Sequence, residues 1–184
     1  MILRRILFTL LLVIQAGLGL RVMLRLVRTA SGSRIRANDS AGEPEDGCAV
    51  IVPVLNEALR LAPCLVGLSS AGPEVREILV VDGGSTDGTQ VLLAEWAARD
   101  ARIRMIDASP VPENWNGKAW GLQAGLDTAD AASPWILTMD ADVRPAPGLA
   151  PALMVHAQAE RIVALSAATR GPCPGRSGPT GVSA

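Results

Sequence analysis

The sequence predicts an α/β fold: a mostly parallel sheet flanked by helices and preceded by one N-terminal transmembrane helix. Two observations predict it. Short apolar runs alternate with segments of helical periodicity from residue 48 onward, and a longer apolar run lies near the N-terminus. The chain has 184 residues, of which 49% are hydrophobic, so it can bury one core of ordinary size but not two full domains.

The N-terminal apolar run covers residues 6–20 and is interrupted only by Gln15. Extending it to Leu26 gives 21 residues, which is close to the roughly 20 that span a bilayer, provided that the arginines near its end reach toward the headgroups. A signal anchor over residues 1–28 fits this pattern best. A cleaved signal peptide and an interfacial amphipathic helix remain alternatives.

Arginine is more frequent after this run than before it. The positive-inside bias therefore predicts that the C-terminal bulk of the chain lies in the cytoplasm, at the inner membrane. The arginines concerned are Arg4 and Arg5 before the run, and Arg21, Arg25, Arg28, Arg34 and Arg36 after it.

A polar linker is predicted over residues 29–47, which are rich in Ser, Gly, Asp, Glu and Pro, and a folded domain over residues 48–170. Because the apolar runs of this domain alternate with helical segments, they predict parallel strands covered on both faces. The predicted strands cover residues 48–54, 78–82, 103–106, 135–139 and 162–167, and the predicted helices cover residues 57–70, 87–99, 117–129 and 147–158.

Polar residues gather where the predicted strands end, which is where parallel sheets bind their ligands. Taken singly, each has an ordinary explanation as a helix cap, a tight turn or a surface charge. Their order along successive strand ends favours one shared ligand site. The clusters are Pro53-Val54-Leu55-Asn56-Glu57, Asp82-Gly83-Gly84-Ser85-Thr86-Asp87-Gly88-Thr89, Gly117-Lys118-Ala119 and Asp140-Ala141-Asp142.

The residue types in these clusters suit a diphosphate. A divalent cation held by carboxylates can neutralise its charge, and Asp140 and Asp142 would face one ligand if the backbone between them is extended. Lys118 lies at the predicted start of a helix, where backbone N–H groups and the helix dipole also favour an anion. Gly117 lets the backbone come close to such a ligand.

Together these motifs resemble the ordered motifs of family 2 glycosyltransferases, which have the GT-A fold, and the resemblance covers residues 48–167. It implies transfer of one sugar from a nucleotide-sugar donor, with UDP-sugars favoured, and Mn²⁺ or Mg²⁺ as cofactor. It assigns Pro53, Asn56, Glu57 and Asp82 to the pocket around base and ribose, Lys118 to the nucleotide or its phosphates, Asp140 to the ribose or the metal, and Asp142 to the metal and the diphosphate.

Residues 114–120, with the sequence Asn-Trp-Asn-Gly-Lys-Ala-Trp, further resemble the hopanoid-associated, membrane-anchored subgroup of this family. The predicted anchor favours a lipid or membrane-associated acceptor. One departure is local: the family often has two acidic residues after the second strand, whereas Gly83 follows Asp82 here and cannot contact the base with a side chain.

Charge and cysteine content exclude two other classes of site. The net charge of −1 argues against a nucleic-acid partner, which requires a basic surface. The three cysteines, Cys48, Cys64 and Cys173, have no CxxC spacing, so the sequence predicts neither a disulfide framework nor a zinc site.

The end of the chain departs from the family. Residues 171–184 hold four Gly and three Pro and are predicted to be a disordered or aberrant tail. Family members usually continue into a half that supplies the acceptor site and the general base. The expectation is therefore an incomplete domain, from a truncated or frameshifted gene, in which no residue is named as the catalytic base.

Three functions compete at this point. The leading one is an inverting sugar transferase acting on a lipid or membrane-associated acceptor. The second is a non-catalytic nucleotide-binding fragment of such an enzyme. The third is a phosphohydrolase of the haloacid dehalogenase type, since Asp140-x-Asp142 follows an apolar run, but Arg144 stands where that family usually has Thr or Val.

Overall fold

The computed structural model describes residues 2–30, 35 and 46–167, and the chain divides into two compact units. The first unit contains one long helix, α1 (Ile2–Ala30). Its segment Arg5–Val27 is long and apolar enough to cross a membrane, although an N-terminal signal sequence has the same properties. Most of the predicted linker and all of the predicted tail lie outside the described residues, so both remain predictions.

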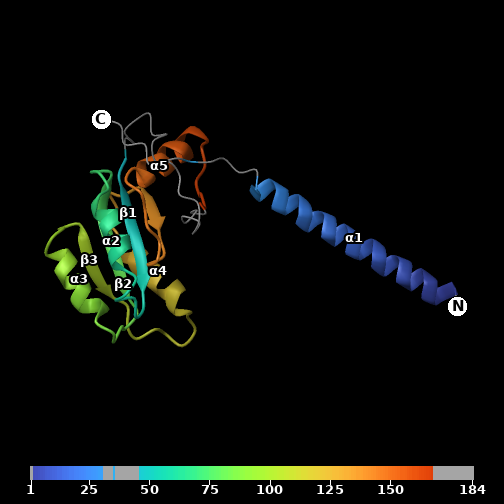
Figure 1. The fold of residues 1–184 in the computed structure, drawn as a ribbon, viewed down its shortest axis with the longest axis horizontal. Helices are drawn as coiled ribbons and strands as arrows, with labels where there is room; N and C mark the ends of the chain where they lie inside the picture. Colours follow the sequence, from blue (N-terminus) through green and yellow to red (C-terminus); the bar gives the residue numbers. More distant parts are fainter. Residues whose placement is uncertain (1, 31–34, 36–45, 168–184) are drawn as a thin grey trace, which may run out of the picture. The chain divides into compact units, whose positions relative to one another are not determined.

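The second unit is an α/β domain with a four-stranded, wholly parallel sheet in the order β3-β2-β1-β4 (Figure 1). This confirms the predicted fold class. The strands are β1 (Cys48–Val54), β2 (Val75–Asp82), β3 (Ile103–Asp107) and β4 (Trp135–Thr138), and the helices are α2 (Ala62–Ser69), α3 (Thr89–Ala97), α4 (Gly117–Thr128) and α5 (Leu149–Ala159).

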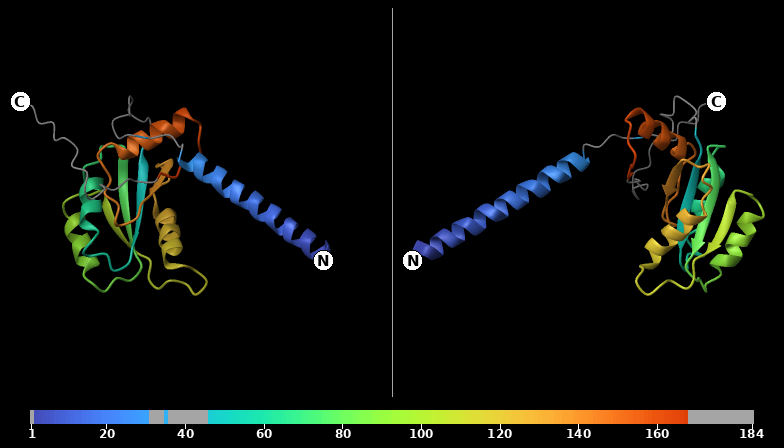
Figure 2. Two further views of the ribbon diagram at one scale, coloured as in Figure 1. Left: turned by 45° about the vertical axis from the view of Figure 1, so that its right-hand side comes forward. Right: turned by 180° about the vertical axis from the view of Figure 1, so that it is seen from behind.

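Helices cover both faces of the sheet. One core cluster joins β1 and β2 to α2, α3 and α5, and a smaller one joins the opposite face to α4 (Figure 2). Alternation along β1 explains the division, because Val50 and Val52 belong to the first cluster and Ile51 to the second. All three are at most 1% exposed, and each such buried side chain contributes about 1.5–3 kcal/mol.

Two glycines bring α4 unusually close to the sheet. A Cβ built on Gly125 would lie 2.5 Å from Cγ2 of Ile51 and 3.1 Å from Cγ2 of Val81. A Cβ on Gly121 would lie 3.1 Å from Cβ of Pro53. The absence of a side chain at both positions therefore allows α4 to approach the central strands closely. This packing also determines where the start of α4 lies relative to the sheet.

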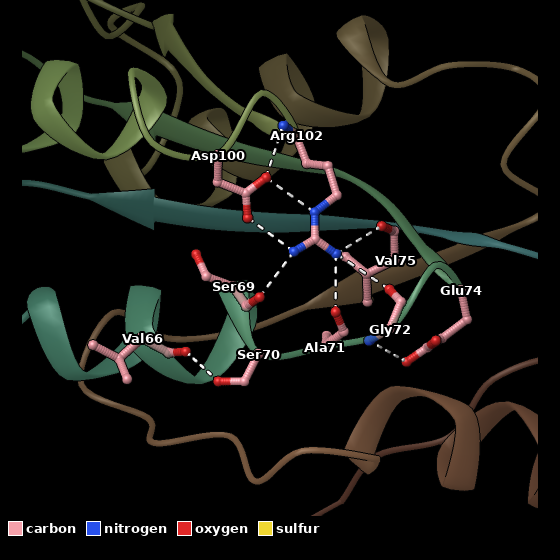
Figure 3. A network of polar contacts seen from close by, with 9 residues as sticks. All are labelled: Val66, Ser69, Ser70, Ala71, Gly72, Glu74, Val75, Asp100 and Arg102. Carbon is pink, nitrogen blue, oxygen red and sulfur yellow. Dashed lines mark hydrogen bonds and ion pairs between the residues drawn. The ribbon is translucent and has the colours of Figure 1, made fainter.

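An arginine ties together several segments at the amino ends of the strands (Figure 3). Arg102 donates through Nε and Nη2 to the two carboxylate oxygens of Asp100, at 3.0 and 2.8 Å. This hydrogen bond is the main cause that lowers the pKa of Asp100. The guanidinium also donates to the carbonyl oxygens of Ser69, Ala71, Gly72 and Val75.

The first helix of the domain starts later than predicted. Residues 57–61 form a turn in which the amides of Arg60 and Leu61 both bond to the carbonyl of Glu57, and α2 begins only at Ala62. Pro63 follows at once, and proline is tolerated in a first helical turn but not further inside a helix. The proline therefore fixes the helix start near residue 62.

The predicted fifth strand is wrong. Residues 162–167 are described but form no strand. The chain instead turns back at the end of α5: Arg161 has a left-handed backbone, with φ of 53°, and the amide of Ile162 bonds to the carbonyl of Ala157 at 2.8 Å. Val163 is 97% exposed. Within the described residues β4 pairs with β1 alone and forms an edge of the sheet.

Candidate functional site

The loops that follow β1 and β2 form one hydrogen-bonded platform at the carboxyl ends of these strands. The Asn56 amide donates to Oγ of Ser85 at 2.8 Å, and the Asn56 side-chain oxygen accepts from the amide of Thr86 at 2.9 Å. Asn56 adopts φ of 56°, a left-handed conformation that asparagine tolerates better than most residues. One residue thus supplies both the turn and two of the contacts between the loops.

Two neighbouring residues extend this platform. The amide of Glu57 donates to Oγ1 of Thr89 at 3.0 Å, and the amide of Ala58 donates to Oδ2 of Asp87 at 3.0 Å. Thr89 also donates its hydroxyl to Oδ1 of Asp87, and this is the main cause that lowers the pKa of Asp87. The two sequence motifs predicted to share a site are therefore in direct contact.

Asp82 lies beneath the platform and is 1% exposed. Its Oδ1 accepts from the amide of Ser85 at 3.0 Å and from the Ser85 hydroxyl at 2.5 Å. Its Oδ2 accepts from Nε2 of Gln90 at 2.7 Å. The carboxylate thus holds the loop after β2 in this structure. Its assignment to the nucleotide pocket remains a prediction.

Pro53 and the Glu57 side chain also make contacts within the protein. Pro53 is half-buried and faces Gly121 of α4. The Glu57 carboxylate forms an ion pair with Arg60, with Nε 2.9 Å from Oε2. Both residues lie at the end of β1, where the sequence predicted them, and their roles in base and ribose binding remain predictions.

A second part of the site joins the start of α4 to the end of β4. Asn116 caps α4, because its side-chain oxygen accepts from the amide of Lys118 at 3.0 Å. The Lys118 ammonium lies 2.6 Å from Oδ1 of Asp140. Both side chains remain open to solvent, at 59% and 56% exposure. The predicted cluster around Lys118 is therefore in contact with the predicted cluster around Asp140.

The Asp140-x-Asp142 segment differs from the expectation in one respect. It forms a turn rather than an extended strand, since the amide of Val143 bonds to the carbonyl of Asp140 at 3.1 Å. Strict alternation therefore does not orient the two carboxylates. Both are exposed, whereas Ala141 between them is buried in the core.

A buried cysteine of α2 lies against this turn. Sγ of Cys64 is 3.9 Å from both the carbonyl oxygen of Asp140 and Sδ of Met139. Burial, and then the charge of Asp142, raise the pKa of the Cys64 thiol to about 11. The thiol is therefore a neutral support for the turn.

The carboxylates of Asp140 and Asp142 are not part of a larger cluster of metal-binding side chains in the described residues. Among the described residues, no group of three or more His, Cys, Asp or Glu side chains is arranged to hold a metal ion. Mg²⁺ and similar hard cations usually keep several waters and bind through one or two carboxylates together with substrate phosphates. Asp140 and Asp142 fit that mode and do not fit a metal cage built from protein alone.

A groove of about 640 Å³ begins at Lys118 and Asp140 and continues along β4 and α5. Its lining beyond this polar end is mainly apolar, and includes Trp135, Leu137, Leu149, Leu153 and Met154. The groove was not expected from the sequence, in which residues 162–167 predict a strand; residues 163–167 instead line the groove as coil.

Two tryptophans stand beside the start of α4. The rings of Trp115 and Trp120 meet edge to face with centroids 5.4 Å apart. Nε1 of Trp120 donates to the carbonyl of Ala108 at 2.7 Å, which anchors α4 to the segment after β3. Trp115 is 43% exposed. Trp120 is therefore an anchor, and Trp115 presents part of its ring to solvent near Lys118.

Comparison with known proteins identifies a sequence family. The profile of the family described as glycosyl transferase family 2 matches residues 49–180. The lipopolysaccharide core biosynthesis glycosyltransferase LpsC of Rhizobium meliloti is 34% identical over 90 residues, which cover 49% of this chain and 29% of that protein. The dodecaprenyl-phosphate galacturonate synthase of Rhizobium johnstonii is 30% identical over 109 residues, which cover 57% of this chain and 30% of that protein.

The crystal structure of a mycobacterial protein resembles the chain with a TM-score of 0.50 at 23% identity, covering 68% of this chain and 40% of that one. At this identity the likeness concerns the fold alone. The matched segments span less than a third of the length of the two curated relatives.

Proposed function

The chain belongs to glycosyl transferase family 2, and from this premise we propose that it takes part in the transfer of a sugar from a nucleotide-sugar donor to a lipid or membrane-associated acceptor. The observation that carries the proposal is the meeting of Lys118 with the Asp140-x-Asp142 turn at the carboxyl ends of the strands. A parallel sheet binds ligands at that edge. The family assignment leaves the phosphohydrolase alternative without support.

In this proposal the donor lies across the strand ends. The Lys118 ammonium and the N-terminal dipole of α4 attract the diphosphate, which places it beside Asp140. Asp140 and Asp142 would hold a Mn²⁺ or Mg²⁺ ion, which when bound neutralises charge on the departing diphosphate. The platform formed by Asn56 and the loop after Asp82 receives base and ribose.

A lipid acceptor fits the rest of the chain. The helix α1 has the length and composition of a membrane anchor, and the distribution of arginines favours a domain on the cytoplasmic side of the inner membrane. One relative is named for lipopolysaccharide core biosynthesis and the other for a dodecaprenyl-phosphate product. The resemblance of residues 114–120 to the hopanoid-associated subgroup agrees with a lipid acceptor, and a UDP-sugar remains the proposed donor.

A second candidate is nucleotide binding without turnover. The matched segments cover 29% and 30% of the two curated relatives, so turnover, like the acceptor, is part of the proposal. None of the carboxylates in residues 46–167 is proposed as the general base. The two candidates share the donor site and differ in catalysis. Release of UDP from a UDP-sugar in the presence of membrane lipid would support the transferase, and binding without such release would support the second candidate.

Calorimetric titration of UDP and of GDP into the full chain, held in detergent micelles, tests the shared donor site. We expect binding that requires Mn²⁺ and weakens at least about tenfold in Asp142→Asn, because a hydrogen bond or ligand contact of a charged group is lost. Asp127→Asn is the matched control: this carboxylate lies on α4 and pairs with Gln123. Equal binding with and without Mn²⁺, or an Asp142→Asn variant that binds like Asp127→Asn, would contradict the proposal.

A further inference from the structure

The ion pair between Lys118 and Asp140 has a property that the proposed function leaves unused. Lys118 is the only lysine in the chain, and its ammonium already occupies Oδ1 of Asp140 at 2.6 Å. Both side chains line the same groove. The carboxylate expected to receive a divalent cation is therefore neutralised in this structure by a cation that belongs to the protein.

Both partners are held by well-packed elements. Asn116 caps the helix turn that carries Lys118, and Gly125 fixes α4 against Ile51. On the other side, the Asp140 carbonyl is bonded by the amide of Val143 and touched by Cys64. The backbones of Lys118 and Asp140 are thus fixed at a distance that the two side chains span, so the ion pair re-forms whenever no ligand separates it.

A divalent cation and an ammonium compete for this carboxylate. A cation that binds Asp140 must displace the ammonium or lie within a few ångströms of it, where two positive charges repel. A diphosphate removes the conflict, because its oxygens accept hydrogen bonds from lysine and also ligate the cation. Once Lys118 has turned to the phosphates, Asp140 is open to the metal.

We propose that Lys118 makes metal binding at Asp140 depend on the diphosphate, by exchanging its ion pair with Asp140 for one with the phosphates. This inference rests on the proposed function, since it takes Asp140 as part of the metal site. It implies that cation and diphosphate bind cooperatively, and that each raises the affinity of the other by the same factor. When the diphosphate leaves, the ammonium returns to Asp140 and helps to release the cation.

The test measures the dissociation constant of Mn²⁺ from the full chain in micelles, by electron paramagnetic resonance of free Mn²⁺, without UDP and with saturating UDP. Complexes of Mn²⁺ with UDP in solution are subtracted. In Lys118→Gln, we expect Mn²⁺ to bind about two- to fivefold more tightly without UDP, because an exposed ion pair of ordinary strength no longer competes. With saturating UDP we expect no change, so the ratio of the two constants falls about two- to fivefold.

Two further variants make this readout specific. Lys118→Arg keeps the charge and should retain most of the ratio. Arg99→Gln removes one positive charge just beyond the C-terminal end of α3, where Arg99 lies over the ring of Trp96, and should change neither dissociation constant. A purely structural role of Lys118 would alter stability and leave the ratio of the two constants unchanged.

The outcomes distinguish this inference from the proposed function. Cooperative binding of Mn²⁺ and UDP with the same ratio in Lys118→Gln overturns the inference and leaves the proposed function standing. If Lys118→Gln binds Mn²⁺ more tightly by the same factor with and without UDP, the inference is also overturned, because the lysine charge then repels Mn²⁺ in both states and no exchange of ion pairs takes place. Wild-type protein that binds neither Mn²⁺ nor UDP removes both.

Discussion

The close packing of α4 on the sheet gives the sharpest test of the fold. In Gly125→Ala, the new methyl group would lie 2.5 Å from Cγ2 of Ile51 and 3.1 Å from Cγ2 of Val81. Ile51 is 1% exposed and belongs to the central strand β1, so it has little room to move. Overpacking of this kind costs about 1–3 kcal/mol. Replacing glycine by alanine inside a helix stabilises the folded state by about 0.5–1 kcal/mol, which offsets part of this cost.

The expected net effect of Gly125→Ala is therefore a loss of about 1–2 kcal/mol in the free energy of unfolding. Urea unfolding followed by tryptophan fluorescence measures it, since the four tryptophans Trp96, Trp115, Trp120 and Trp135 all lie in the α/β domain. The helix start should also shift, so the same variant should bind UDP with Mn²⁺ more weakly than the wild type.

Two comparisons identify the cause. Gly117→Ala is the matched control, because its Cβ would meet only Cγ2 of Val111, at an ordinary 3.9 Å, and it should be neutral or slightly stabilising. In an Ile51→Ala background, Gly125→Ala should cost almost nothing, because the clashing methyl group is gone. The coupling between the two changes is then about 1–2 kcal/mol. A Gly125→Ala protein as stable as the wild type would refute the account of α4 docking.

Two other predictions concern acid and thiol chemistry. In the folded chain, hydrogen bonds lower the pKa of Asp87, Asp100 and Asp107, and the largest contributions come from the side chains of Thr89, Arg102 and Ser109, respectively. The three carboxylates contribute fully to the free energy of unfolding above their unfolded pKa of about 3.9, and this contribution is lost as the pH falls through their lower folded pKa values. Stability measured by urea unfolding at a series of pH values should therefore decline below about pH 4. In Asp100→Asn, which also weakens the Arg102 contacts, the decline should be less steep. A decline that begins above pH 6 would contradict this explanation. Burial raises the pKa of Cys48 and of Cys64 to about 11, so neither thiol should react with iodoacetamide at pH 8 in the native protein, and both should react in 6 M urea, as followed by peptide mass spectrometry. Rapid alkylation of Cys64 in the native chain would mean that the turn at Asp140 opens.

Much of the fold was accessible from the sequence because its evidence is local. The apolar run at residues 48–54 has the bounds of β1, and the predicted starts of β3, α4 and β4 agree with the structure. The start of α2 was misplaced because the helical spacing of leucines outweighed Pro63. The prediction of a fifth strand was wrong for a different reason. An apolar run becomes a strand only if a neighbouring strand pairs with it, and residues 162–167 have no such neighbour in the described part of the chain.

The candidate site was predictable in its residues but not in its contacts. Motif order placed Lys118 and Asp140 at the same edge, yet the 2.6 Å ion pair depends on how closely α4 approaches β1, which two glycines decide. The sequence also could not indicate that the Asp82 carboxylate is occupied by Ser85 and Gln90, since these contacts depend on the path of a loop. The sequence also left open whether the backbone between Asp140 and Asp142 is extended, and the structure has a turn there.

The double role of Asn56 limits which residues the chain can accept at that position. Glycine preserves the left-handed backbone and loses the acceptor for the amide of Thr86. Aspartate keeps the acceptor but adds a negative charge beside the end of β2 and the loop after it, which already carry Asp82 and Asp87. Alanine fails on both counts, and the strained backbone alone costs about 1–2 kcal/mol. In a library of all single substitutions selected for nucleotide binding, position 56 should therefore be among the least tolerant, although its side chain is exposed to solvent.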